Sequence, residues 1–268
     1  MDELGFNAEY EALKVRRDVL REQYADQIEM LAHLENVEKP AIESQYMLLV
    51  GQFEYRIYEL KIEIRRWKRR FEMRQRAINR NEKPDLLAIE AALDTEFAEF
   101  AEAVQKHLDE IKKAVLYADA EKLSEEESNK LRLLYHDAAK KLHPDLNPEQ
   151  DEREKNLWVQ IQTAYNDKNW DKFRFLVGLA DGVVAEKATF DPGTDCMAQL
   201  QEAITQLQTK LQALHDRICD MKGRKPFIYE AFLADPKQVE ERQGQLCAQI
   251  TMLEKYVREY EELWKHGQ

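Results

Sequence analysis

Glycine and proline are scarce in this sequence, and long uncharged apolar runs are missing. The 268 residues include only 8 glycines and 7 prolines, so few sharp turns are available and we expect few, long elements. No stretch approaches the ~20 consecutive apolar residues that a helix needs to cross a bilayer. A membrane is therefore not among the expected partners.

Cysteine is equally scarce, with Cys196, Cys219 and Cys247 as the only three. An odd number without Cys-x-x-Cys spacing predicts neither a disulfide framework nor a metal site, and no cofactor is expected. Since no apolar segment of a signal peptide follows Met1, a reducing, cytoplasmic setting fits best. Cys219 and Cys247 are expected to be small packing residues beside a helical seam.

Charge is abundant: 34% of the residues are Asp, Glu, Lys or Arg, and 44% are hydrophobic. This balance is typical of long solvated helices with apolar seams, and it predicts an all-α fold. The net charge of −12 argues against general binding to nucleic acids.

Apolar residues at spacings of three and four predict coiled-coil helices in the first half of the chain. The predicted helices span 7–36, 42–80 and 86–115. The first should stop at Lys39-Pro40, because proline disfavours helix in the residue before it. A short turn at 81–84 should make the second and third helices antiparallel.

The second helix ends in a basic run, 61–80, and the third begins with an acidic run, 85–102. Antiparallel packing would bring these opposite charges together. An alternative is a nucleic-acid stripe in which Trp67 and Phe71 stack on bases. Because both aromatics lie in the apolar seam, the packed arrangement is favoured.

The last third repeats the pattern, with one seam over 197–221, a break at KGRKPF and a second seam over 239–264. We expect a C-terminal antiparallel hairpin over 196–268. Gln243 is the only polar residue in the second seam. It either selects the register or lies at a frayed edge, and the second option is slightly favoured.

The middle of the chain differs from both arms. Ser124 and Glu127 have the spacing of a capping box, and the helix they start must end near His143, because Pro144 disfavours helical geometry there. One side of this helix, called here the basic face, has a cation or a histidine every fourth residue, and Lys141 lies next to it. The basic face consists of Arg132, His136 and Lys140.

A second helix over 149–167 should pack antiparallel to the first, and a short third helix over 170–179 should close the bundle. The expected domains are then an N-terminal coiled-coil region, a small helical bundle, a linker and the C-terminal hairpin. They span 1–123, 124–180, 181–195 and 196–268.

The stretch KLRLLYHDAAKKLHPDLNP, followed by NLWVQIQTAYND, resembles helix II, the His-Pro-Asp loop and helix III of a J-domain, the DnaJ-family module. The matching positions fall in the family's order, but the resemblance covers only about a fifth of the chain, residues 124–180. They are Leu131, Tyr135, Ala139, Lys141, His143, Pro144, Asp145, Trp158, Ile161, Ala164 and Tyr165.

The resemblance implies a partner, because J-domains dock on a DnaK-type ATPase chaperone and stimulate its ATP hydrolysis. His143, Pro144 and Asp145 would form the triggering loop. The electrostatic docking residues would be Arg132, Lys140 and Lys141. The coiled-coil arms would bind a client or scaffold protein, or form a homodimer.

The sequence also departs from the family. The usual first helix is missing, and its place is expected to be taken by residues 108–116. Asp137 stands where a basic residue is usual, and Leu142 where an aromatic residue is common. The Gly/Phe-rich linker and the zinc-binding repeats are absent.

An enzyme is not expected, because no nucleophile or carboxylate constellation accompanies His136 or His143. The competing function is a structural or adaptor protein in which the J-like bundle serves as a rigid joint and stimulates no ATPase. An exposed loop at 143–145 would favour the co-chaperone. Packing of this loop against a coiled-coil arm would favour the joint.

Overall fold

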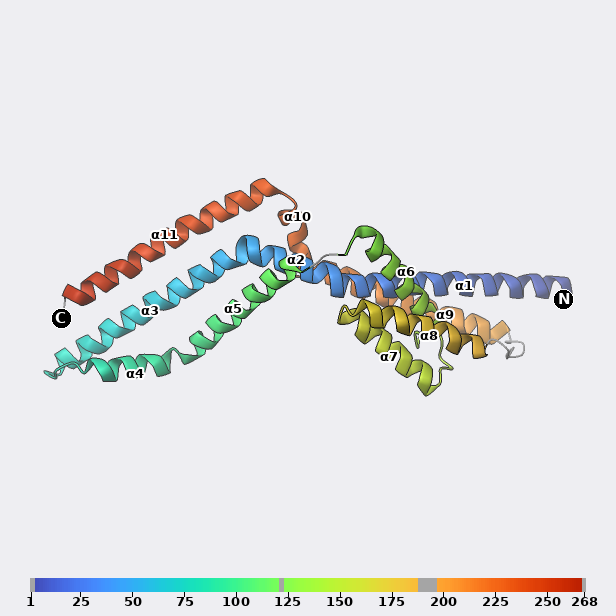
Figure 1. Cartoon of the computed structure of the whole chain (residues 1–268), viewed down its shortest axis with the longest axis horizontal. Coiled ribbons are helices and arrows are strands. Elements are labelled where there is room, and N and C mark those ends of the chain that lie inside the picture. The colour runs from blue at the N-terminus through green and yellow to red at the C-terminus, as the bar shows by residue number, and fades with distance from the viewer. Residues whose placement is uncertain (1–2, 121–122, 188–196, 267–268) are drawn as a thin grey trace. The chain divides into compact units, whose positions relative to one another are not determined.

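The computed structural model describes residues 3–120, 123–187 and 197–266, and all of their regular elements are helices (Figure 1). The predicted all-α fold is confirmed for this part of the chain. Among the same residues, no helix combines the length and the hydropathy of a membrane span. Two compact units are present: Met1–Pro40 with Glu121–Phe227, and Ala41–Ala120 with Ile228–Gln268.

The chain stays helical through Pro40, so the break expected at Lys39-Pro40 is wrong. The N-terminal elements follow one another directly: α1 (Glu3–His33), the π-helix η1 (Leu34–Glu38), α2 (Lys39–Tyr46), the π-helix η2 (Met47–Gly51) and α3 (Gln52–Asn79). The Lys39 amide donates to the Leu34 carbonyl, five residues back. This wider turn gives the proline ring room that a regular α-helical turn would not, and Pro40 lies in the first turn of α2.

In the first unit, α6 (Glu125–Leu142), α7 (Glu152–Asn166) and α8 (Trp170–Lys187) pack around one core. Tyr135 of α6 contacts Trp158 and Tyr165 of α7, with ring centroids 5.6 and 4.5 Å apart. Phe173 of α8 is fully buried beside them. The predicted apolar faces of the middle segment therefore meet as expected.

Helix α8 is longer than the predicted 170–179. Residues 181–187 of the expected linker are helical, and the rest of that linker, 188–195, lies outside the described residues. Gly182 does not stop the helix, because a helical glycine costs only about 1 kcal/mol relative to alanine. Burial of Ala180 and Val183 on the core side offsets that cost.

Helix α1 completes the first unit by packing against both α6 and α9 (Met197–Lys222). Helices α1 and α9 run in the same direction (Figure 1), and Arg217 of α9 pairs with Glu35 at 2.8 Å. Ile28 and Ala32 of α1 contribute to the α6–α8 core. Residues 108–116 were expected beside α6, but they belong to α5 (Ala98–Asp119) in the other unit, and α1 packs against α6 instead.

In the second unit, α3 contacts α4 (Leu86–Glu96), α5 (Ala98–Asp119) and α11 (Pro236–His266). As the charge pattern predicts, ion pairs join α3 to α4: Arg70 to Glu90 at 2.5 Å and Arg69 to Glu96 at 3.0 Å. Trp67 lies in the seam, with its ring centroid 6.3 Å from that of Trp264.

The expected C-terminal hairpin is not formed, because α9 and α11 belong to different units. Between them lie η3 (Phe227–Tyr229) and α10 (Glu230–Leu233). Helix α9 packs along α1, and α11 packs along α3. A heptad seam shows which face of a helix is buried but not which helix covers it, and the seams of this chain are alike.

Two smaller expectations are also wrong. Cys219 and Cys247 are exposed rather than packed, because they lie on the solvent side of their helices. Cys219 Sγ is 3.5 Å from His215 Nε2, one helical turn away. Gln243 is not at a frayed edge, because its Nε2 donates to the Leu49 carbonyl of η2 at 2.7 Å.

Candidate functional site

The loop that carries the His-Pro-Asp tripeptide connects two helices with well-defined ends. Helix α6 starts with the predicted capping box, in which the Glu127 amide donates to Ser124 Oγ at 3.2 Å. At its other end His143 has φ −72° and ψ 130°, the extended geometry that Pro144 favours in the preceding residue. Helix α7 begins with a second capping box, formed by Asp151 and Glu154.

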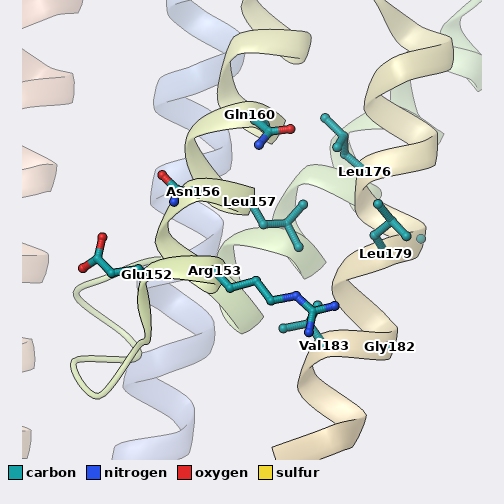
Figure 2. A pocket seen from close by; sticks show the side chains of 10 residues that line it. Glu152, Arg153, Asn156, Leu157, Gln160, Leu176, Leu179, Gly182 and Val183 are labelled. Carbon is teal, nitrogen blue, oxygen red and sulfur yellow. The ribbon is translucent and has the colours of Figure 1, made fainter.

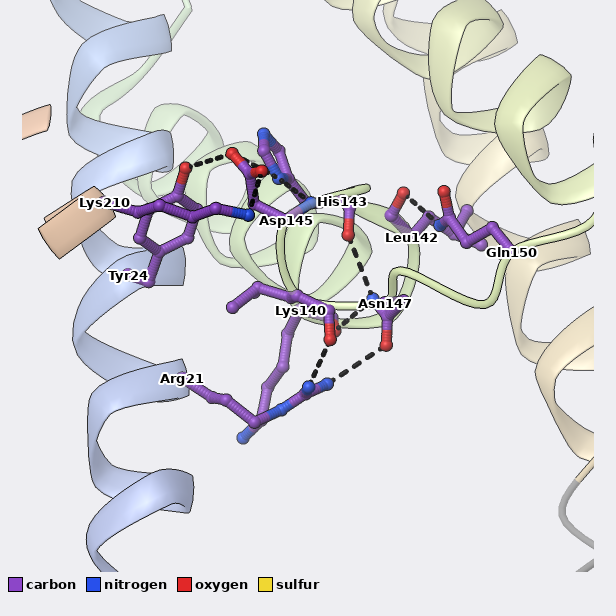
Figure 3. A network of polar contacts seen from close by, with 10 residues as sticks. Arg21, Tyr24, Lys140, Leu142, His143, Asp145, Asn147, Gln150 and Lys210 are labelled. Carbon is purple, nitrogen blue, oxygen red and sulfur yellow. Dashed lines mark hydrogen bonds and ion pairs between the residues drawn. The ribbon is translucent and has the colours of Figure 1, made fainter. Parts of the chain in front are cut away.

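Hydrogen bonds within the loop fix the tripeptide (Figure 3). The Asp145 amide donates to His143 Nδ1 at 3.1 Å, and the Leu146 and Asn147 amides donate to the His143 carbonyl at 3.0 and 2.9 Å. The Asn147 side chain donates to the Lys140 carbonyl at 3.1 Å. These bonds come from α6 and the loop alone, so the turn is set by its own segment of sequence.

His143 lies between two aromatic rings, Trp158 of α7 and Tyr24 of α1. Both meet the imidazole edge to face, with centroids 5.5 Å away. The His143 side chain is only 14% exposed. Burial lowers the pKa of His143 below its ordinary value; the Asp145 carboxylate acts in the opposite direction, and Lys210 adds to the lowering. The imidazole is therefore neutral at pH 7.

Asp145 is held by two residues from distant parts of the sequence. The Tyr24 hydroxyl donates to Oδ2 and Lys210 Nζ of α9 donates to Oδ1, both at 2.6 Å. Burial opposes ionisation, but the hydrogen bonds from Lys210 and Tyr24 outweigh it and keep the pKa of Asp145 below its usual value. The carboxylate is thus ionised and occupied on both oxygens.

Further contacts tie the loop and the basic face to α1. Arg21 donates to the Leu146 carbonyl and, at 3.0 Å, to Asn147 Oδ1. Arg132 forms a two-pronged pair with Glu29, with N···O distances of 2.6 and 3.0 Å.

Lys140 pairs with Glu22 of α1. His136 Nε2 lies 3.3 Å from Asp26 Oδ1. Lys141 points elsewhere and pairs with Asp181 of α8 at 2.5 Å.

The structure thus brings together the tripeptide and Lys140, and it places Arg132 farther along the same α6 face. Sequence reasoning did not identify Tyr24, Arg21 or Lys210 as neighbours of the loop, and no local pattern connects them to it. A signal for α1 was present, however. The acidic edge of α1, defined as Glu22, Asp26 and Glu29, has nearly the same spacing as the basic face of α6.

The loop is packed against α1 and α9 rather than free. Pro144 is exposed, but the Asp145 side chain is only 38% exposed and that of His143 far less. By the criterion drawn from the sequence, this packing favours the rigid joint. The packing is polar at Asp145 and aromatic at His143, so both candidate functional side chains are engaged within the chain.

An open groove of about 660 Å³ lies between α7 and α8 (Figure 2). Arg153, Asn156 and Gln160 line one side, and Leu176, Leu179 and Val183 the other. No residue of the tripeptide or of the basic face lines this groove.

Metal-ligand chemistry finds no support in the part of the chain that the structure describes, where no three His, Cys, Asp or Glu residues are grouped to hold a metal ion. No protein-family model, no curated protein and no solved structure matches this chain.

Proposed function

We propose that α6, α7 and α8 form a J-domain-type module that docks on a DnaK-type ATPase chaperone and stimulates its ATP hydrolysis. His143, Pro144 and Asp145 would be the triggering loop, and Arg132, Lys140 and Lys141 the docking cations. The observation that supports this best is the turn at 143–147, which forms a set of hydrogen bonds within α6 and the loop themselves.

The physical requirements of such docking agree with this site. A loop that is already ordered loses little conformational entropy when a partner binds. Once freed from the carboxylates that they pair with, Arg132, Lys140 and Lys141 would give a local positive surface in a chain whose net charge is −12. Such a surface can steer the module onto an acidic partner.

The helical arms would supply the second binding function, to a client or scaffold protein or to a second copy of the chain. Apolar side chains on the second unit are available for this: Leu87 of α4 is 84% exposed and Leu116 of α5 is 70% exposed. Sedimentation equilibrium would show whether a second copy is the occupant.

The test of the co-chaperone function is single-turnover ATP hydrolysis by a DnaK-type chaperone over a range of concentrations of this protein. We expect hydrolysis to accelerate with wild type, to lose that acceleration with His143→Gln, and to keep it with His215→Gln. His215→Gln is the matched control because it makes the same change at an exposed position on α9. Two further variants, Tyr24→Phe and Lys210→Met, each remove one contact to Asp145 and are assayed in the same way.

If folded wild type and both contact variants leave hydrolysis unchanged, the co-chaperone function is wrong. The second candidate is then the rigid joint, and the two occupied oxygens of Asp145 favour it. In a joint, His143→Gln would lower the stability of the first unit without any effect on an ATPase.

A further inference from the structure

The basic face of α6 already has an acidic partner within the chain. Glu22 of α1 pairs with Lys140, and Glu29 forms the two-pronged pair with Arg132. Between them, His136 lies 3.3 to 3.5 Å from carboxylate oxygens of Asp26 and Glu22. The order of the contacts shows that α1 runs antiparallel to α6, so its acidic edge follows the basic face over two helical turns.

The tripeptide is engaged by the same element. Tyr24 packs on His143 and donates to Asp145, and Lys210 of α9 takes the other carboxylate oxygen. Arg21 holds the backbone directly after the tripeptide. One pair of helices, α1 and α9, thus contacts both the loop and two of the three cations that the proposed function assigns to docking, Arg132 and Lys140. The third, Lys141, pairs with Asp181 of α8.

We propose that the α1–α9 pair is a built-in competitor that occupies the chaperone-docking surface, so that docking requires α1 and α9 to release the loop. This inference rests on the proposed function. The acidic edge of α1 fills the position of the acidic partner surface, and Tyr24 and Lys210 act as a latch on Asp145. Because the turn at 143–147 is held by its own hydrogen bonds, it keeps its shape when the latch opens.

The latch has a measurable consequence. When only a fraction of the molecules is open, the apparent dissociation constant equals the intrinsic one divided by that fraction. Weakening the latch should therefore lower the concentration of this protein that half-saturates the chaperone. The maximal acceleration should not change, because the triggering residues are intact.

The experiment is a titration of a DnaK-type chaperone with the full-length protein, monitored by single-turnover ATP hydrolysis. Tyr24→Phe removes one hydrogen bond and should lower the half-saturating concentration about 3-fold. Together with Lys210→Met the reduction should reach about 10-fold. Lys222→Met, which makes the same charge change on the same helix, should behave as wild type. Circular dichroism checks that each variant is folded.

If wild type and the latch variants have equal half-saturating concentrations, the proposal that α1 and α9 compete for the docking surface is wrong. The proposed co-chaperone function would not be affected by that result. A lower maximal acceleration in the latch variants would also overturn it, because Tyr24 and Lys210 would then support the trigger rather than restrain it. If neither wild type nor any variant accelerates hydrolysis, the proposed co-chaperone function is wrong, and the proposed competition by α1 and α9 is then wrong as well.

Discussion

At the scale of single residues, His143 shows how packing controls a titratable group. Its ring lies between Tyr24 and Trp158, and burial lowers its pKa below the ordinary 6.5. The folded state then binds fewer protons than the unfolded state just below pH 6.5. The contribution of His143 to stability is therefore complete above about pH 6.5 and is lost as the pH falls through its folded pKa.

This predicts that the His143 ring signals, followed by NMR against pH, titrate with a midpoint below 6.5. In Tyr24→Ala, which uncovers one face of the ring, the midpoint should rise toward 6.5, because water can then solvate the imidazolium. The dispersion of the spectrum shows whether the variant remains folded. A wild-type midpoint at or above 6.5 would contradict the buried position of the ring.

At the scale of elements, α8 shows that two glycines do not end a helix when its other face is buried. Gly178 and Gly182 lie on the exposed side, and an added Cβ would meet no atom within 4 Å at either position. The same helix buries Phe173, Val177 and Ala180. The low helix propensity of glycine therefore opposes a continuous α8, but burial of the apolar face stabilises the helix enough to outweigh it.

We predict that Gly178→Ala and Gly182→Ala each raise the free energy of unfolding of the first unit by about 0.5–1 kcal/mol, since alanine loses less backbone entropy. Urea denaturation at constant m-value would measure the change. As a control, Ala180→Gly on the buried face should lower stability by about 1 kcal/mol or more. A loss of stability in both glycine variants would show that these positions need close backbone contact.

At the scale of the whole molecule, each unit pairs an N-terminal helix with a C-terminal one running in the same direction. Within the first unit Ile204 of α9 is buried along α1, and within the second Leu253 of α11 is buried along α3. A hairpin of α9 and α11 would have buried the same side chains. The apolar seams alone do not distinguish the two pairings.

Hydrogen exchange by mass spectrometry can distinguish them. Ile204→Asp should speed amide exchange in α1 and α9 by opening that pair, because a charge in an apolar seam is poorly solvated. Leu253→Asp should do the same in α3 and α11. If Ile204→Asp instead sped exchange in α11, the hairpin pairing would be right and the pairing of α9 with α1 would be wrong.

Local features of the sequence determined most of the helices and the shape of the loop. The capping box at Ser124, the helix end before Pro144 and the turn after α3 follow from side chains within a few residues of each other. The seam of α3 and its ion pairs to α4 were likewise readable from spacing and charge. The π-helical turns around Pro40 were not, because nothing local distinguishes them from a helix end.

Tertiary structure alone decided which helices pair and what covers the tripeptide. Tyr24, Asp145 and Lys210 are far apart in the sequence, and they meet only because α1 packs on α6 and α9 together. Hydrophobic burial is non-directional, so an apolar seam accepts any partner of similar shape. The choice among partners depends on contacts spread over the whole unit, which no short stretch of sequence contains.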